Sequence, residues 1–175
     1  MSSSDEHFMD LALEQARAAL QAGEFPVGAV MVADGRVVAD GSRRNSRSGS
    51  PEIPATELDH AEIVALRELL LHQPEIERRS LTLYSTMEPC LMCYATLLLN
   101  GVRRIVYAYE DAMGGGTSLP LAQLAPLYRE MAAAVEIVPH IRRRRSLELF
   151  KQFFRDPANN YWRGSLLEEY TLTRK

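Results

Sequence analysis

The sequence predicts an α/β protein, a three-layer α/β/α sandwich around a central mixed sheet of five strands. Short runs rich in Val, Ile and Leu alternate along the chain with longer segments of helical periodicity. The joins between them are short, as expected for crossover units whose helices cover both faces of a sheet. No internal repeat or domain linker interrupts this pattern, so we expect a single domain over residues 1–175.

The first part of the chain predicts a helix followed by a β-hairpin. Apolar residues recur at helical spacing from about His7 to Ala22, and Gly23 follows as a helix end. The Val-rich run over residues 27–32 predicts a buried strand. An Asp-Gly turn joins it to a returning strand over residues 36–39.

Two places in this part are candidates for contact with a substrate. Gly28 and Ala29 indicate either tight packing or a close approach of the backbone to a flat ligand. Residues 41–56 are rich in Gly, Ser, Pro, Asn and Arg, and predict a surface loop at the mouth of any pocket near the next helix. Asn45 in this loop is a candidate substrate contact because its amide can both donate and accept. A solvated turn is the alternative.

The rest of the chain continues the alternation of strands and helices. Strands are predicted over residues 81–86, 102–108 and 135–138. Helices are predicted from His60 onward, from Pro89 to Leu99, in part of 119–134, from Arg142 to Phe154, and briefly over 166–170.

Composition indicates a cytoplasmic globular protein. Hydrophobic residues make up 46% of the chain and charged residues 25%, as in ordinary soluble domains. No apolar stretch is long enough to span a bilayer, and the N-terminus lacks a basic-then-apolar export signal. Both cysteines belong to the second motif described below, which leaves none for a disulfide and suits a reducing compartment. We expect no membrane partner.

Charge limits the partners of the chain. The formal net charge of -3 gives no general attraction to nucleic acid, so any such contact needs a local patch. The run Arg142–Arg145 opens a predicted helix, where the helix dipole disfavours cations. It therefore favours an anionic partner, such as phosphate, RNA or acidic residues of a neighbouring subunit. A solvated run is the alternative.

Two short motifs, H-x-E at residues 60–62 and P-C-x-x-C at residues 89–93, each open a predicted helix. Asp59 precedes the first as a natural N-cap, and Pro89 suits the first position of the second. Cysteines three residues apart share one face of a helix, and a helix N-terminus stabilises the thiolate that binds metals. Both motifs therefore place metal-binding groups at helix starts.

Together the motifs provide the parts of a catalytic metal site. A catalytic zinc ion takes three protein ligands and keeps one position open for water. His60, Cys90 and Cys93 would supply these ligands. Glu62 would remain free to accept a proton from the water and pass it to a leaving group.

Each of these residues also has an ordinary explanation. The cysteines could be a redox pair, Glu62 could close a capping box with Asp59, and His60 could be a simple helix-start histidine. All of these explanations would have to hold at once, so we favour the zinc site.

Two more segments are candidates for substrate recognition. The Gly-rich loop over residues 109–118 follows a predicted strand, where ligand sites of α/β proteins commonly lie. Its Glu110 and Asp111 could choose the substrate or could only solvate the loop. Residues 155–175, here called the C-terminal segment, follow a core over about 7–154 and contain the only tryptophan, Trp162. This segment could be a lid over a flat ring, or could anchor the C-terminus on the core.

The motifs at residues 60–62 and 89–93 resemble those of the cytidine and deoxycytidylate deaminase superfamily. Within it the chain is similar, over Phe8–Phe154, to the branch of tRNA-adenosine, guanine and cytosine deaminases. Further points of resemblance are a first strand at residues 24–30, a base- or ribose-binding asparagine at Asn45, and the loop after the fourth strand at Asp111 and residues 116–119.

The resemblance implies a zinc ion held by His60, Cys90 and Cys93, with Glu62 as the proton shuttle. It also implies that main-chain groups of Ala29 and Cys90 touch the base or the metal-bound hydroxyl, and that the protein is a homodimer.

The expected activity is hydrolytic removal of an amino group from a purine or pyrimidine base, with release of ammonia. Three departures from tRNA-adenosine deaminases favour a small nucleobase or nucleoside as substrate: a longer loop before His60, Asp59 in place of a small residue, and an aromatic C-terminal segment in place of a basic extension. The alternatives are adenosine in a tRNA anticodon, and a non-catalytic scaffold stabilised by zinc.

Overall fold

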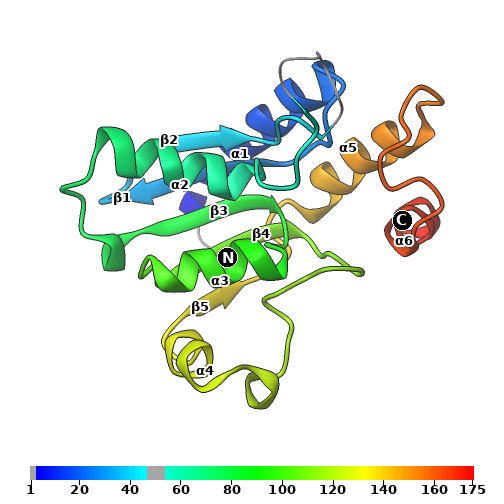
Figure 1. Cartoon of the computed structure of the whole chain (residues 1–175). Coiled ribbons are helices and arrows are strands. Elements are labelled where there is room, and N and C mark those ends of the chain that lie inside the picture. Colours follow the sequence, from blue (N-terminus) through cyan, green and yellow to red (C-terminus); the bar gives the residue numbers. More distant parts are fainter. Residues whose placement is uncertain (1–2, 47–53) are drawn as a thin grey trace.

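In the computed structural model, which describes residues 3–46 and 54–175, five strands form one sheet in the order β2-β1-β3-β4-β5 (Figure 1). The strands are β1 (Gly28–Ala33), β2 (Arg36–Ser42), β3 (Thr82–Met87), β4 (Arg104–Tyr109) and β5 (Glu136–Val138). β1 runs antiparallel to both of its neighbours, whereas β3, β4 and β5 are parallel to one another. The predicted mixed sheet of five strands is therefore confirmed.

Helices cover both faces of this sheet, which gives the predicted three layers (Figure 1). They are α1 (Ser3–Gln21), α2 (Ala61–His72), α3 (Leu91–Leu99), α4 (Pro126–Ala132), α5 (Arg143–Arg155) and α6 (Leu166–Thr173), with 3-10 turns at Arg78–Ser80 and Leu121–Gln123. α1, with α5 beside it, packs on one face, and α2 and α3 pack on the other. α6 packs against α5. Among the described residues, no helix combines the length and the apolar character needed to cross a membrane.

Two apolar clusters separate the layers. Leu13 of α1 and Val30 of β1 belong to the first cluster. Met31, the next residue along β1, belongs to the second, together with Leu69 of α2 and Leu97 of α3. Successive side chains of a strand point to opposite faces, so a strand covered on both faces needs apolar residues throughout. This explains the continuous apolar run of β1.

α1 begins at Ser3, earlier than the predicted start near His7. Asp5 in its first turn places a negative charge where the helix dipole favours one. The same buried carboxylate accepts hydrogen bonds from Arg104 Nη1 and Tyr84 Oη, each at 2.8 Å. The Arg104 hydrogen bond lowers the pKa of Asp5 despite its burial. Tyr84 and Arg104 lie far from Asp5 in the sequence, so the local pattern did not indicate that α1 begins about one turn before His7.

Both motif helices begin later than predicted. Asp59 is not the N-cap of α2; the cap is His60, with φ -65° and ψ 149°. Pro89 is not the first residue of α3, whose N-cap is Cys90, with φ -64° and ψ 169°. Asp59 instead accepts a hydrogen bond from the Asn45 amide at 2.7 Å. Because an N-cap side chain projects from the start of its helix, the two caps place two metal-binding groups beyond the ends of α2 and α3.

Close packing of helices on the sheet requires two glycines. A Cβ on Gly28 would lie 2.3 Å from Ala12 O and 2.4 Å from Ala16 N, which are main-chain atoms of α1. This favours tight packing over ligand contact as the reason for Gly28. Gly41, predicted to start a loop, lies in β2, where a Cβ would be 2.4 Å from Ala61 O of α2.

Acidic side chains of the same chain neutralise most of the basic run at the start of α5. Arg142 and Arg145 both contact Asp10 of α1, and Arg143 contacts Glu110 at the end of β4. The partners of these three arginines are therefore carboxylates of the same chain, which were not among the anionic partners predicted for Arg142–Arg145.

Candidate active site

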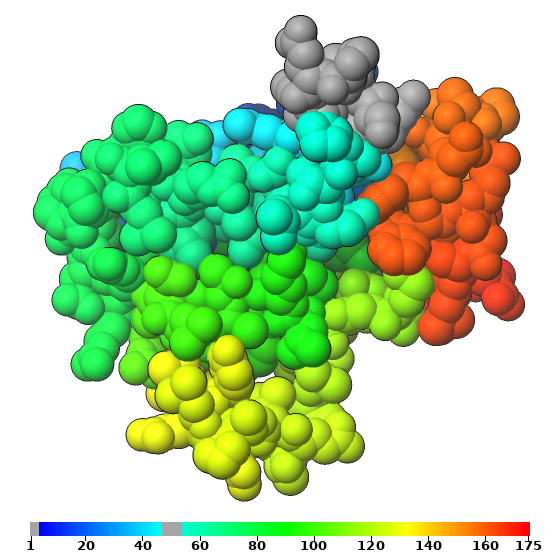
Figure 2. All heavy atoms as spheres, viewed as in Figure 1, coloured from blue at the N-terminus to red at the C-terminus, as the bar shows by residue number. Residues whose placement is uncertain are grey.

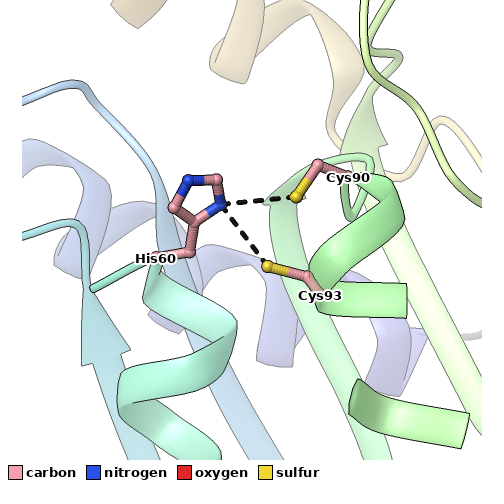
Figure 3. Close-up of side chains that lie close together, drawn as sticks. All are labelled: His60, Cys90 and Cys93. Carbon is pink, nitrogen blue, oxygen red and sulfur yellow. Dashed lines mark hydrogen bonds between the residues drawn. The ribbon is translucent and has the colours of Figure 1, made fainter. Parts of the chain in front are cut away.

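The starts of α2 and α3 bring His60, Cys90 and Cys93 together (Figure 3). His60 Nδ1 lies 3.5 Å from Cys90 Sγ and 3.4 Å from Cys93 Sγ. All three ligand atoms lie within 4.8 Å of one another. Cys93 follows the cap residue Cys90 by about one turn of α3, so both sulfur atoms face the imidazole.

This donor set fits zinc in a catalytic site. Imidazole nitrogen and thiolate sulfur are preferred zinc ligands. In a tetrahedral site with a Zn–S distance of about 2.3 Å and a Zn–N distance of about 2.0 Å, each sulfur lies about 3.5 Å from the nitrogen. The observed 3.5 Å and 3.4 Å agree with that geometry. His60 and Cys90 also line a cavity, which leaves room for a fourth, non-protein ligand.

The two thiols differ in acidity in the metal-free protein. A hydrogen bond from Cys93 lowers the pKa of Cys90 to about 4 against the effect of burial, and His60 contributes in the same direction. The same hydrogen bond, together with burial, raises the pKa of the Cys93 thiol. One thiolate therefore exists already at neutral pH, and metal binding must displace the proton of the other.

Glu62 lies in the first turn of α2, beside the ligands but not among them. Its carboxylate is buried, and Ser85 Oγ donates a hydrogen bond to Oε1 at 3.1 Å. Burial raises the pKa of this carboxyl, although His60 opposes the effect. Glu62 also lines the cavity. A buried carboxyl with a raised pKa, next to a metal site, is placed to accept and return a proton.

A cavity of about 430 Å³ adjoins the ligand group. Apolar side chains from separate parts of the chain form much of its wall: Phe25, Val27, Met87 and Leu167. At this edge of the molecule the C-terminal segment lies against the residues before α2 and the loop after β4 (Figure 2). Apolar walls with polar groups at one end suit a flat ring whose polar edge faces the metal ligands.

Two of the predicted substrate contacts, Asp111 and Trp162, line this cavity. Ala29, Asn45 and Glu110 are not among its lining residues in the described part of the chain. Ala29 is completely buried in β1. The contact of its main chain with a base stays a prediction.

Asn45 closes a loop rather than lining the cavity. Its Nδ2 donates to Asp59 at 2.7 Å, and its main-chain oxygen accepts from Thr56 N at 2.8 Å. Its φ of 55° lies in the left-handed region, which Asn adopts more readily than most residues. Residues 47–53 of the predicted loop lie outside the described residues. Asn45 thus helps hold the chain just before α2, and its contact with a substrate stays a prediction.

The loop after β4 is built around buried Glu88, which directly precedes the second motif and to which the sequence assigned no role. Glu88 Oε1 accepts hydrogen bonds from Thr117 Oγ1 at 2.6 Å and Ser118 N at 3.1 Å. Its Oε2 accepts one from Asp111 N at 3.2 Å. The Asp111 carboxylate accepts from two main-chain amides of the same loop. Asp111 therefore shapes the cavity rim, and Glu88 ties that rim to the start of α3.

Glu110 contacts the last two helices. Its carboxylate accepts hydrogen bonds from Arg143 Nε at 2.7 Å and from Tyr170 Oη at 2.8 Å, and His140 Nδ1 lies 3.5 Å away. Burial raises the pKa of Glu110, but hydrogen bonds from Arg143, the main chain and Tyr170 outweigh it and hold the pKa at about 2. Glu110 thus anchors α5 and α6 to the end of β4.

We expect Glu110→Gln to remove part of the pH dependence of stability. A carboxyl with a folded pKa of about 2 and an ordinary value of 4.5 stabilises the fold above its ordinary value, and this contribution disappears as the pH falls through its folded value. The contribution is roughly 3 kcal/mol at neutral pH. Urea titrations of metal-free wild type and variant should give free energies of unfolding that differ most near neutral pH and converge in strong acid. Glu14→Gln, on the exposed side of α1, is the control. A difference that stays constant with pH would contradict this role of Glu110.

Two residues at the cavity edge, Arg43 and Glu57, gave no recognisable signal in the sequence, whereas Tyr161 belongs to the aromatic C-terminal segment that the sequence singled out. Arg43, Glu57 and Tyr161 all line the cavity. Arg43 Nη2 lies 2.9 Å from Glu57 Oε2, and Tyr161 Oη donates to the same oxygen at 2.8 Å. Only folding brings together residues so widely separated along the chain.

The C-terminal segment both lines the cavity and anchors the end of the chain. Tyr161 packs against Phe25, with ring centroids 5.3 Å apart, and Leu167 is buried. Trp162 is 43% exposed, and its φ of 56° is unusual for a bulky residue. The segment is therefore anchored on the core, whereas its role as a lid over a flat ring stays a prediction.

Comparison with known proteins connects this geometry to a family. Residues 2–109, which include all the residues of both motifs, match the model of the cytidine and deoxycytidylate deaminase zinc-binding region. The tRNA-specific adenosine deaminase of Agrobacterium fabrum (strain C58 / ATCC 33970) is 33% identical over 157 residues, which are 86% of this chain and 93% of that protein. The tRNA-specific adenosine deaminase of Aquifex aeolicus (strain VF5) is 30% identical over 111 residues, 63% of this chain and 70% of that protein.

Solved structures share the fold. A structure from work on A-to-I editing by tRNA:A34 deaminases at the wobble position of transfer RNA has a TM-score of 0.63 at 32% identity, and covers 76% of this chain and 96% of its own. A guanine deaminase from Nitrosomonas europaea has a TM-score of 0.67 at 20% identity, and covers 85% of this chain and 83% of its own. At that identity the second similarity supports the fold alone.

Proposed function

Because this chain belongs to the cytidine and deoxycytidylate deaminase family and is a zinc-dependent hydrolytic deaminase, we propose that its substrate is an adenosine in the anticodon of a tRNA. The observation that carries this proposal is the 33% identity with a tRNA-specific adenosine deaminase over 93% of that protein. Water would replace the 6-amino group of adenine, giving inosine and ammonia. The sequence departures that favour a small nucleobase are local, whereas this similarity extends over most of the chain.

The site provides the groups that the reaction needs. Zinc held by His60, Cys90 and Cys93 would supply a water nucleophile at neutral pH. Glu62 would take a proton from the attacking water and deliver it to the departing amino group, and its raised pKa suits both steps. The hydrogen bond from Ser85 holds Glu62 in place. The apolar walls keep bulk water away from the ring.

The cavity constrains how an RNA could be bound. A volume of about 430 Å³ accepts one base with part of its ribose but no stacked strand, so the adenosine must leave its stack to enter. Phe25 and Leu167 would contact the faces of the base, and Trp162 at the rim would stack on a neighbouring base. With a net charge of -3, contacts to phosphate would depend on local exposed cations such as Arg44 and Arg163.

A free nucleobase or nucleoside is the second candidate substrate. One observation favours it: Tyr161, Trp162 and Leu167, all from the C-terminal segment, form part of the cavity wall. A wall from that segment would suit a small ligand that the protein encloses.

Substrate specificity can be tested by assaying one preparation against an anticodon stem–loop, free bases and nucleosides. Zinc-loaded protein should convert adenosine to inosine in an anticodon stem–loop, measured by mass spectrometry of digested nucleosides, and binding should weaken as salt increases. The same preparation should release no ammonia from guanine, adenine, cytosine or their nucleosides. Glu62→Gln protein, purified in parallel, controls for contaminating deaminases. Ammonia from a small substrate without inosine in the RNA would replace the tRNA proposal by the second candidate.

We also propose that the protein is cytoplasmic, and that it is a homodimer, as the family resemblance implies. Leu91 and Leu99 of α3 and Leu127 of α4 are more than half exposed, at 53%, 54% and 52%. Their helices lie next to each other on the face seen in Figure 2. This surface is available to a second copy, and light scattering would detect a monomer if the proposal is wrong.

A further inference from the structure

One carboxylate oxygen, Glu57 Oε2, is contacted by groups from three separate parts of the chain. Arg43 Nη2 lies 2.9 Å away, and Tyr161 Oη donates to it at 2.8 Å. His60 Nε2 lies 3.5 Å from the same oxygen. The two nitrogens of the His60 ring therefore have different neighbours: Nδ1 faces the sulfur atoms of Cys90 and Cys93, and Nε2 faces Glu57.

We propose that Glu57 is a positioning residue for the metal ligand His60. Its carboxylate would accept a hydrogen bond from the Nε2–H group and so hold Nδ1 toward the metal. A neutral imidazole that binds metal through Nδ1 carries its proton on Nε2. An acceptor at that position fixes the tautomer and the orientation of the ring, and makes the ligand nitrogen more basic. As the N-cap of α2, His60 makes no side-chain capping hydrogen bond that could fix its ring instead.

The Glu57 carboxylate is itself held in place. Its side chain is 62% exposed, so burial alone does not order it. Arg43 is only 2% exposed, and its guanidinium also donates to Thr56 O at 2.8 Å, which fixes it against the residue before Glu57. A buried cation strongly favours a nearby carboxylate. Arg43 and Tyr161 therefore orient Glu57 Oε2 toward His60.

This arrangement couples the C-terminal segment to the metal site. Tyr161 belongs to that segment and is held by the Phe25 ring and by the Arg43 guanidinium, which lies 5.7 Å from its ring centroid. Loss of the Tyr161 hydroxyl should therefore loosen Glu57 and, through it, His60. Of the four residues in this link, Tyr161 lies outside residues 2–109, the region that matches the family model.

Zinc affinity of the full-length protein, measured by competition with a chromophoric chelator, tests the proposal without reference to substrate. We expect Glu57→Gln to lower the affinity about tenfold and Glu57→Ala up to about 100-fold. Tyr161→Phe removes one donor but keeps the carboxylate, and should cost about threefold. Glu68→Gln is the matched control, because it alters another Glu–His pair on α2, 3.2 Å apart and exposed, and should leave the affinity unchanged.

Cobalt spectra distinguish positioning from a general loss of stability. The visible bands of Co²⁺ in the site depend on ligand geometry, so they should shift in Glu57→Gln but not in Glu68→Gln. Thermal unfolding of metal-free Glu57→Gln measures the cost of losing the Arg43 ion pair separately from the loss of zinc affinity. Wild-type zinc affinity and spectrum in Glu57→Gln would overturn the proposal. Unchanged affinity in Tyr161→Phe would overturn the link to the C-terminal segment. Both outcomes are independent of whether tRNA or a small base is the substrate.

Discussion

Glu62→Gln is expected to lower kcat by about 10²- to 10⁴-fold while the protein keeps its zinc. The amide has nearly the size of the carboxyl and still offers an oxygen to Ser85 Oγ, which donates to Oε1 at 3.1 Å in the wild type. Packing of this buried position is therefore preserved. The variant loses the ability to carry a proton between the attacking water and the leaving amino group, which a carboxyl with a raised pKa can do.

Turnover and zinc content should be measured on the same preparation, by product analysis and elemental analysis. Glu14→Gln makes the same chemical change at an exposed position of α1 and should leave kcat unchanged. Full activity in Glu62→Gln would show that this carboxyl is not the proton shuttle. Loss of zinc together with activity would show that Glu62 supports the metal site instead.

The metal centre could be predicted from sequence because its residues lie in two short motifs at helix starts. Spacing within each motif is local information, and His60, Cys90 and Cys93 do converge as expected. The details of the helix ends could not be predicted. Asp59 has the chemistry of an N-cap, but the Asn45 amide competes for its carboxylate, and His60 takes the cap position.

A long-range ion pair accounts for two residues for which the sequence predicted other partners. Glu110 was a predicted substrate contact, and Arg143 belonged to a run predicted to meet an anion. In the structure they bind each other across 33 residues of sequence, so each satisfies the other's charge. The predictions for Glu110 and Arg143 depended only on nearby residues in the sequence. No local pattern indicates an ion pair between residues so far apart. The same holds for Arg43, Glu57 and Tyr161.

The preference for a small nucleobase rested on three local departures: the long loop before α2, Asp59 and the aromatic C-terminal segment. Asp59 accepts a hydrogen bond from the Asn45 amide, which gives it a structural role in the loop before α2. The C-terminal segment does line the cavity, which keeps the small substrate as a candidate. We base the proposal of a tRNA substrate on the similarity to tRNA-specific adenosine deaminases, which extends over most of the chain.

Gly41→Ala is expected to destabilise the fold by about 3 kcal/mol and to weaken zinc binding as well. The new Cβ would lie 2.4 Å from Ala61 O and 2.6 Å from Ala65 N. Both atoms belong to the main chain of α2, so no side chain can rotate away, and the helix must move off β2. Because His60 caps this helix and Glu62 lies in its first turn, that movement would shift a metal ligand relative to Cys90.

Chemical denaturation and chelator competition would measure the two effects of Gly41→Ala separately. Gly35→Ala is the matched control. Its φ of +72° makes a side chain unfavourable by about 1 kcal/mol, but a Cβ there meets no atom within 4 Å. Gly35→Ala should therefore lose some stability and keep its zinc affinity, whereas Gly41→Ala should lose both. Wild-type zinc affinity in Gly41→Ala would show that α2 can adjust without moving its metal-binding end, and that the contact with β2 does not set the position of His60.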